Sequence, residues 1–182
     1  EELTSLYEEL SASEEELQTQ YNELLVHQDS LKTMAYFDVL TGLPNRTMFV
    51  EKFDEIMKLD GSSIALIFMD IDNFKLINDS YGHNIGDALL VETGRRIQGL
   101  CTKNIMLFRL GGDEYAILLW GDINHSRIEV FVRDMSDVLD ESYNVQGFQF
   151  NITSSIGIAI YPDDASSFNE LLKYSDTAMY VA

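Results

Sequence analysis

Leucine recurs at every seventh position in the first 36 residues, and neither glycine nor proline interrupts the pattern. The positions three residues further on are partly polar. The leucines are Leu3, Leu10, Leu17, Leu24 and Leu31, and the companion positions are Leu6, Ser13, Gln20, His27 and Met34. Such a heptad repeat predicts a helix that pairs with a second copy of itself as a coiled coil. The alternative is a solvated single helix with an acidic face, which would leave the leucines in water.

After residue 36, short apolar runs alternate with amphipathic segments. The amphipathic segments predict a helix capped by Asn45 or Thr47 that runs to about residue 59, and further helices at 73–81, 85–100, 125–141 and from about 167. The apolar runs predict strands at 63–69, 105–109 and 115–120, and a long strand within 148–161. Residues 111–114 form a hairpin signal between two of these strands. This order predicts an α/β sandwich in which helices flank a mixed, partly antiparallel sheet.

The composition narrows the classes of partner. The chain has 182 residues, of which 46% are hydrophobic, and 31 acidic against 12 basic residues give a net charge of −19. This balance argues against binding of nucleic acid or anionic lipid, because both require basic surface. An acidic protein can still bind an anionic nucleotide when a divalent metal supplies positive charge.

The apolar runs and the single cysteine bear on location. The longest apolar run, Ile64–Met69, is too short to span a bilayer, and no basic segment followed by an apolar one opens the chain. Cys101 is the only cysteine, which fits a reducing compartment. We therefore expect a cytoplasmic protein without direct membrane insertion, although the parent protein could be anchored upstream.

Four acidic residues stand where strands are expected to end. Asp70 and Asp72 follow an almost entirely apolar strand, and Asp113 and Glu114 lie in the hairpin that could pair beside it. Carboxylates that converge on one rim repel each other unless a hard cation such as Mg²⁺ neutralises them. The alternative is two independent acidic turns, which the spacing alone slightly favours in a chain this acidic.

Five ordered blocks resemble the GGDEF family of diguanylate cyclases. The hairpin string GGDEY differs from the family signature only by tyrosine in the last position. The blocks are DVLTGLPNR at 38–46, FMDIDNFKLINDSYGHNIGDALL at 68–90, GGDEY at 111–115, SIGIAIYP at 155–162 and YSDTAMY at 174–180. The resemblance covers residues 37–182, and we expect a coiled-coil dimerisation or signalling helix over 1–36.

The resemblance implies a nucleotidyl-cyclase, palm-like fold that condenses two GTP into cyclic di-GMP and two pyrophosphates. It also implies a homodimer that uses Mg²⁺ or Mn²⁺. The family pattern makes Asp70, Asp113 and the Ile71 carbonyl metal ligands, and makes Asp113 and Glu114 catalytic, Glu114 by activating the ribose hydroxyl or holding a second metal. By the same pattern Asn73, Phe74 and Lys75 approach the phosphates. Asn78 and Asp87 read guanine.

Three departures from the family pattern matter. Tyr115 replaces phenylalanine, and its hydroxyl is expected to be tolerated. Thr102 and Ile105 replace the arginine and aspartate of the family's product-inhibition site, so no product-inhibition site is expected in this chain. The family continues beyond AMYxA with a lysine and an arginine that hold the outer phosphates, so we expect the domain to be truncated at residue 182.

These departures leave two functions open. The first is an active cyclase. The second is a weakly catalytic, GTP-binding regulatory domain that controls an appended phosphodiesterase or effector. In either case the resemblance implies an upstream sensor domain and allows a downstream phosphodiesterase domain.

Overall fold

The computed structural model describes residues 2–59 and 63–181. The chain divides into two compact units, residues 1–36 and residues 37–182. We describe each unit by itself. No helix within the two described ranges is long and apolar enough to cross a lipid bilayer.

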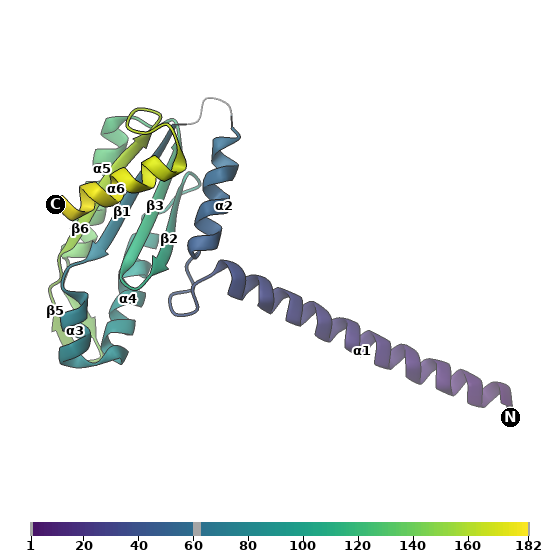
Figure 1. The fold of residues 1–182 in the computed structure, drawn as a ribbon. Helices are drawn as coiled ribbons and strands as arrows, with labels where there is room; N and C mark the ends of the chain where they lie inside the picture. The colour runs from purple at the N-terminus through teal and green to yellow at the C-terminus, as the bar shows by residue number, and fades with distance from the viewer. Residues whose placement is uncertain (1, 60–62, 182) are drawn as a thin grey trace. The chain divides into compact units, whose positions relative to one another are not determined.

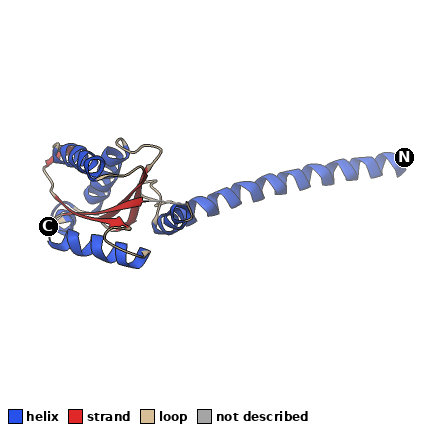
Figure 2. Cartoon of the chain, turned by 90° about the horizontal axis from the view of Figure 1, so that it is seen from above, coloured by secondary structure: helices blue, strands red, loops and turns tan. Residues whose placement is uncertain are grey.

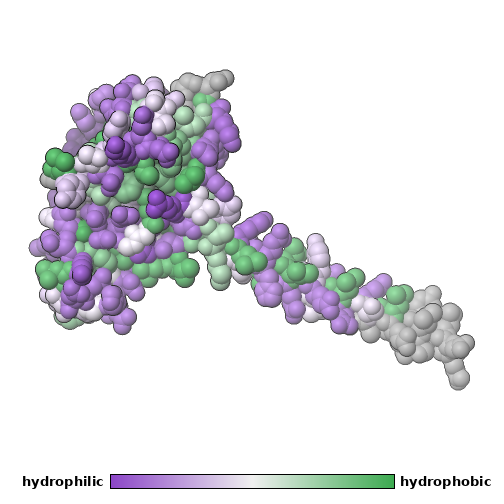
Figure 3. Space-filling view, in the orientation of Figure 1, coloured by the Kyte–Doolittle hydropathy of each residue, from purple (hydrophilic) through white to green (hydrophobic). Residues whose placement is uncertain are grey.

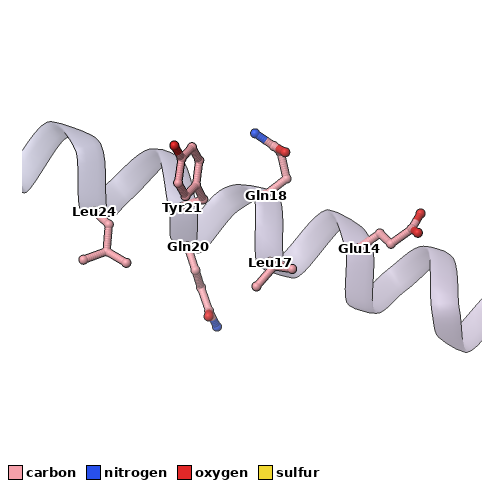
Figure 4. Close-up of a pocket in the computed structure, with 6 residues that line it drawn as sticks. All are labelled: Glu14, Leu17, Gln18, Gln20, Tyr21 and Leu24. Atoms are coloured by element: carbon pink, nitrogen blue, oxygen red, sulfur yellow. The ribbon is translucent and has the colours of Figure 1, made fainter.

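The first unit is one continuous helix, α1 (Glu2–Tyr36). Leu10, Leu17, Leu24 and Leu31 are 55% to 68% exposed in the single chain. Figure 3 shows hydrophobic residues spaced along this helix among hydrophilic ones. In Figure 4, Leu17, Gln20 and Leu24 project to the same side of the helix, as the heptad pattern requires. The leucine stripe is thus formed and is not covered by this unit itself.

The second unit is built on a four-stranded sheet (Figure 1). Its strands are β1 (Ser63–Ile71), β2 (Ile105–Gly111), β3 (Glu114–Gly121) and β6 (Ser154–Tyr161), in the order β2-β3-β1-β6. All three neighbouring pairs are antiparallel, which corrects the expectation of a mixed sheet. β1 and β2 therefore run in the same direction with β3 between them. β3 and β6 also run in the same direction, with β1 between them. Strands that share a direction are therefore never neighbours.

Helices cover both faces of this sheet, so the expected α/β sandwich is confirmed (Figure 2). The helices are α2 (Arg46–Met57), α3 (Phe74–Tyr81), α4 (His83–Gln98), α5 (His125–Asp140) and α6 (Phe168–Val181). Successive side chains of β1 point to opposite faces of the sheet and so belong to two separate hydrophobic cores. Ile67, Met69 and Ile71 pack with apolar residues of α3, α4 and α5, whereas Leu66 and Phe68 pack with those of α2 and α6. Each such buried side chain stabilises the fold by about 1.5 to 3 kcal/mol before entropy is counted.

A separate two-stranded ribbon replaces the first part of the long strand expected within 148–161. It consists of β4 (Tyr143–Val145) and β5 (Phe148–Phe150). Gln146 and Gly147 join the two strands at φ of 48° and 87°, so the chain turns back before β6 begins. Aromatic rings attach this ribbon to α3, because the ring of Tyr81 lies 5.4 Å from Phe148 and 5.0 Å from Phe150, centroid to centroid.

Candidate functional site

The tertiary fold brings together the acidic residues of the strand end and the hairpin. β3 pairs directly beside β1, with Met69 opposite Tyr115, so Asp70 lies next to the hairpin that carries Asp113 and Glu114. The pKa of Asp70 is raised to about 6. Burial is the largest cause, followed by the neighbouring Asp113 carboxyl and the charge of Glu114. The reading of two independent acidic turns is therefore wrong for Asp70 and Asp113.

The pair of carboxylates fits a hard cation. Oδ1 of Asp70 is buried and has no hydrogen-bond partner among the residues that the structure describes. Asp70 and Asp113 can hydrogen-bond to each other only when one carboxyl group carries a proton. When both are ionised, their negative charges repel. A divalent cation would satisfy the lone oxygen and remove that repulsion. Over residues 2–59 and 63–181, no three His, Cys, Asp or Glu side chains form a ready metal cluster. The remaining ligands would have to come from the backbone, from substrate phosphates or from water.

Asp72 lies at the same rim but faces another partner. Its Oδ2 accepts a hydrogen bond from Oγ1 of Thr153 at 2.5 Å, and its Oδ1 accepts one from Oγ of Ser155 at 2.8 Å. Its backbone N–H donates to the Thr153 carbonyl at 3.0 Å. Both carboxylate oxygens of Asp72 are thus hydrogen-bonded to residues at or just before the start of β6.

The turn from β1 into α3 carries the residues expected at the phosphates. Asn73 has left-handed backbone angles, φ 58° and ψ 24°, and α3 begins at the next residue. Phe74 is buried against the core while Lys75 is exposed. The N–H groups of the first two helical residues, Phe74 and Lys75, have no carbonyl of α3 to bond to, so this end of the helix can receive an anion.

The two residues expected at guanine lie on adjoining helices. Asn78 is on α3, and its Oδ1 is buried without a hydrogen-bond partner in the described part of the chain. A Cβ added to Gly86 on α4 would lie 1.9 Å from that oxygen, so any larger residue there would force the Asn78 side chain to move. Asp87, the next residue on α4, is exposed and lines a groove of about 430 Å³. Leu40 and the β4 residue Asn144, which sequence reasoning missed, also line this groove.

Arg109 fixes the hairpin tip, and sequence reasoning missed its role as well. Its buried guanidinium donates to Oδ1 of Asp38 at 2.7 Å and to the Gly112 carbonyl at 2.7 Å and 3.2 Å. Burial raises the pKa of Asp38, but hydrogen bonds from Thr41 and Arg109 outweigh it, and the pKa is lowered. The signal was available, because Arg109 stands two residues before GGDEY and Asp38 opens the first motif block. The pair connects the segment that precedes α2, which contains Asp38, to the hairpin that holds Asp113.

The structure also places the remaining departures from the family pattern. Thr102 is exposed in the loop after α4. Ile105 is 8% exposed and belongs to the core, so this position offers no polar group to a ligand.

Tyr115 is fully buried, and its hydroxyl donates to the Leu90 carbonyl on α4 at 2.8 Å. Burial raises the pKa of this tyrosine, so the hydroxyl stays neutral. The extra oxygen of the GGDEY string therefore has a specific partner.

Tyr115→Phe should lower the free energy of unfolding of the second unit by about 0.5 to 1.5 kcal/mol, because one buried hydrogen bond is lost. The matched control is Tyr174→Phe on the half-exposed face of α6, which should change it by less than about 0.5 kcal/mol. Urea unfolding followed by the fluorescence of the single tryptophan, Trp120 in β3, measures both variants. Equal stability of Tyr115→Phe and the control would contradict this role for the hydroxyl.

Comparison with known proteins bears on the family of this chain. The family model "Diguanylate cyclase, GGDEF domain" matches residues 35–182. MucR of Pseudomonas aeruginosa, a bifunctional diguanylate cyclase/cyclic di-GMP phosphodiesterase, is 34% identical over 152 residues, which are 82% of this chain and 22% of MucR. The diguanylate cyclase TpbB of P. aeruginosa is 35% identical over an aligned length of 189 residues, which covers 100% of this chain and 42% of TpbB. The chain thus spans less than half the length of either relative.

Solved structures agree with the fold. The GGDEF domain of TpbB matches with a TM-score of 0.75 and 33% identity, over 78% of this chain and 91% of that domain. The coiled coil and GGDEF domain of DgcB from Caulobacter crescentus, solved in complex with c-di-GMP, match with a TM-score of 0.84 over 94% of this chain and 93% of that one. At 23% identity the second likeness concerns the fold alone. With a family match over residues 35–182 and carboxylates that meet where the motifs place them, the chain belongs to the GGDEF family.

Proposed function

We propose that this chain is the catalytic module of a diguanylate cyclase, which condenses two GTP into cyclic di-GMP with release of two pyrophosphates. The observation that supports it most directly is the Asp70–Asp113 pair beside the start of α3, in which Oδ1 of Asp70 is buried and has no hydrogen-bond partner among the described residues. A structural turn would not need two repelling carboxylates at this position.

In this proposal Asp70, Asp113 and the Ile71 carbonyl hold Mg²⁺ or Mn²⁺. The bound ion would supply positive charge at the α-phosphate, which the acidic chain itself lacks. The N–H groups of Asn73 and Phe74 and the Lys75 ammonium contact the phosphates. Glu114 accepts the proton of the attacking 3′-hydroxyl or holds a second ion.

Base selection is assigned to Asn78 and Asp87. Guanine offers N1–H and an exocyclic amine side by side, and the carboxylate of Asp87 can accept both hydrogen bonds. Adenine cannot offer this pair of donors, so it would leave a polar group of the pocket unsatisfied. The Oδ1 of Asn78 has no hydrogen-bond partner among the described residues, so it can accept a hydrogen bond from the base.

The reaction requires two copies of the domain, because each holds one GTP and the two substrates attack each other. We propose that the leucine stripe of α1 pairs two chains as a coiled coil and so raises the effective concentration of the second domain. The exposed stripe and the unbroken 35-residue helix support this assignment. The setting proposed for the module is the cytoplasm, with an upstream sensor domain.

A regulatory role is the second candidate, because the relative MucR joins cyclase and phosphodiesterase activities in one protein. In that role the domain would bind GTP, produce little product and control an appended phosphodiesterase.

Incubation of the purified chain with GTP and Mg²⁺, followed by chromatography of the nucleotides, separates the two functions. Cyclic di-GMP with stoichiometric pyrophosphate would establish the cyclase. Binding of GTP without turnover would favour the regulatory domain.

Product should not bind tightly at the position of the family's inhibitory site. Thr102 is neutral and Ile105 is buried, so two charge-assisted contacts of about 1.5 to 3 kcal/mol each are missing. This loss weakens binding by roughly 150-fold or more. Calorimetric titration of cyclic di-GMP into nucleotide-free protein measures the affinity, and progress curves with added product measure inhibition. Submicromolar binding that is lost in Lys103→Ala would show that this surface still holds the product.

A further inference from the structure

Three hydrogen bonds join Asp72 to Thr153 and Ser155 at the edge of the proposed phosphate site. We call Asp72, Thr153 and Ser155 the β1–β6 clamp. In the antiparallel register Ile71 is opposite Ser154, and the bond from the Asp72 N–H to the Thr153 carbonyl extends this ladder by one step. Asp72, Thr153 and Ser155 therefore lie on one face of the sheet, where both hydroxyls reach the carboxylate.

The clamp immediately precedes a left-handed turn residue. Asn73 adopts the left-handed conformation, which asparagine takes more readily than other residues with a Cβ but which is still uncommon, and its side chain makes no capping hydrogen bond within the described structure. A conformation of this kind persists only where its surroundings fix it. On the N-terminal side of Asn73, the surroundings are the three bonds of Asp72. On the C-terminal side, the N–H groups of Leu76 and Ile77 bond to the Asn73 carbonyl.

Stability of the fold does not explain these bonds well. Thr153 is exposed and Ser155 is only partly buried, and neither side chain belongs to either hydrophobic core. The bonds to the carboxylate are short, as hydrogen bonds to a charged acceptor are. They act on the residue that links Ile71, the end of β1, to the start of α3.

We propose that the β1–β6 clamp is a positioning device for the phosphate-binding turn, with Thr153 and Ser155 as positioning residues that act through Asp72. The clamp holds Asn73 left-handed, and this directs the free N–H groups at the start of α3 toward the nucleotide phosphates. It also orients the Asp72 charge toward β6 and away from those phosphates. This assignment rests on the proposed function only for the identity of the anion.

The test uses the double variant Thr153→Val/Ser155→Ala in the full chain. Both changes remove a hydroxyl and keep the side-chain volume nearly constant. Thr153→Ser is the rescue variant, because it retains the hydroxyl. Thr177→Val is the matched control, since it removes an exposed threonine hydroxyl that bonds to the Lys173 carbonyl within α6.

Two measurements are made on each variant. The first is hydrogen–deuterium exchange of the amides at 73–76 in nucleotide-free protein, which reports whether the turn is held. The second is the affinity, with Mg²⁺, for a fluorescent GTP analogue that cannot react at its α-phosphate. We expect faster exchange confined to this turn and an affinity lower by roughly 10- to 100-fold in the double variant. Thr153→Ser and Thr177→Val should resemble the unmodified chain.

Unchanged exchange at 73–76 together with unchanged affinity in the double variant would overturn the proposal. Faster exchange throughout the domain, in the double variant and in the Thr153→Val single variant alike, would overturn it as well, since the hydroxyls would then serve the fold. Failure of the unmodified chain to bind the analogue would contradict the proposed function instead. The exchange measurement would still decide whether the clamp holds the turn.

Discussion

Asp113→Asn should reduce the formation of cyclic di-GMP by at least about 100-fold. Changes to residues that only support metal ligands cost up to about 100-fold in activity, and this substitution changes a proposed ligand itself. The substitution removes one of two carboxylates proposed to hold the metal, and asparagine is a much weaker ligand for a hard cation. The fold should remain intact, because Asp113 is only partly buried in the hairpin and is not a core residue. Chromatography of the nucleotides measures the loss, and circular dichroism checks the fold.

The matched control is Asp163→Asn, which removes one negative charge from an exposed turn after β6. Its rate should equal that of the unmodified chain. The same Asp113 variant should also bring the pKa of Asp70 back toward its ordinary value, because Asp113 is one of the groups that raise it. Carboxyl NMR of metal-free protein follows this titration. Full turnover in Asp113→Asn would remove Asp113 from the metal site and with it the main support for the cyclase.

Leu17→Glu/Leu24→Glu should convert a dimer into a monomer and should lower the specific activity strongly. Four leucines of the paired helices would become charged, and each lost burial is worth about 1.5 kcal/mol or more, so dimerisation should weaken at least about 1,000-fold. Because the proposed reaction joins substrates held by two domains, activity of the unmodified chain should rise more steeply than linearly with concentration near the dissociation constant. Sedimentation velocity and initial rates over a dilution series measure both effects.

The control for charge is Thr19→Glu/Val26→Glu on the same helix. At 100° per residue these positions lie opposite the leucine stripe, and Val26 is 65% exposed. This variant adds the same two charges to α1 but should stay dimeric and active. A leucine double variant that still sediments as a dimer would show that residues 37–182 carry the pairing themselves.

The sequence alone determined the local elements and the motif positions. The heptad leucines specified the first helix, and the apolar runs located β1, β2, β3 and β6, because helical and strand periodicities are properties of neighbouring residues. The GGDEY hairpin was placed correctly for the same reason. The short ribbon of β4 and β5 was missed, since three-residue strands show too little alternation to be recognised.

The tertiary structure decided the contacts of the two carboxylates at the end of β1. The family pattern assigned the metal to Asp70, but residue spacing alone does not distinguish Asp70 from Asp72, and only the fold shows that one meets Asp113 while the other meets Thr153 and Ser155. That choice depends on β3 and β6 pairing on opposite sides of β1, so that residues 43, 81 and 83 positions away supply the partners. The same holds for the buried Arg109–Asp38 pair and for the Tyr115 hydroxyl on Leu90. Such contacts arise from strand register and helix packing, which no local pattern of residues records.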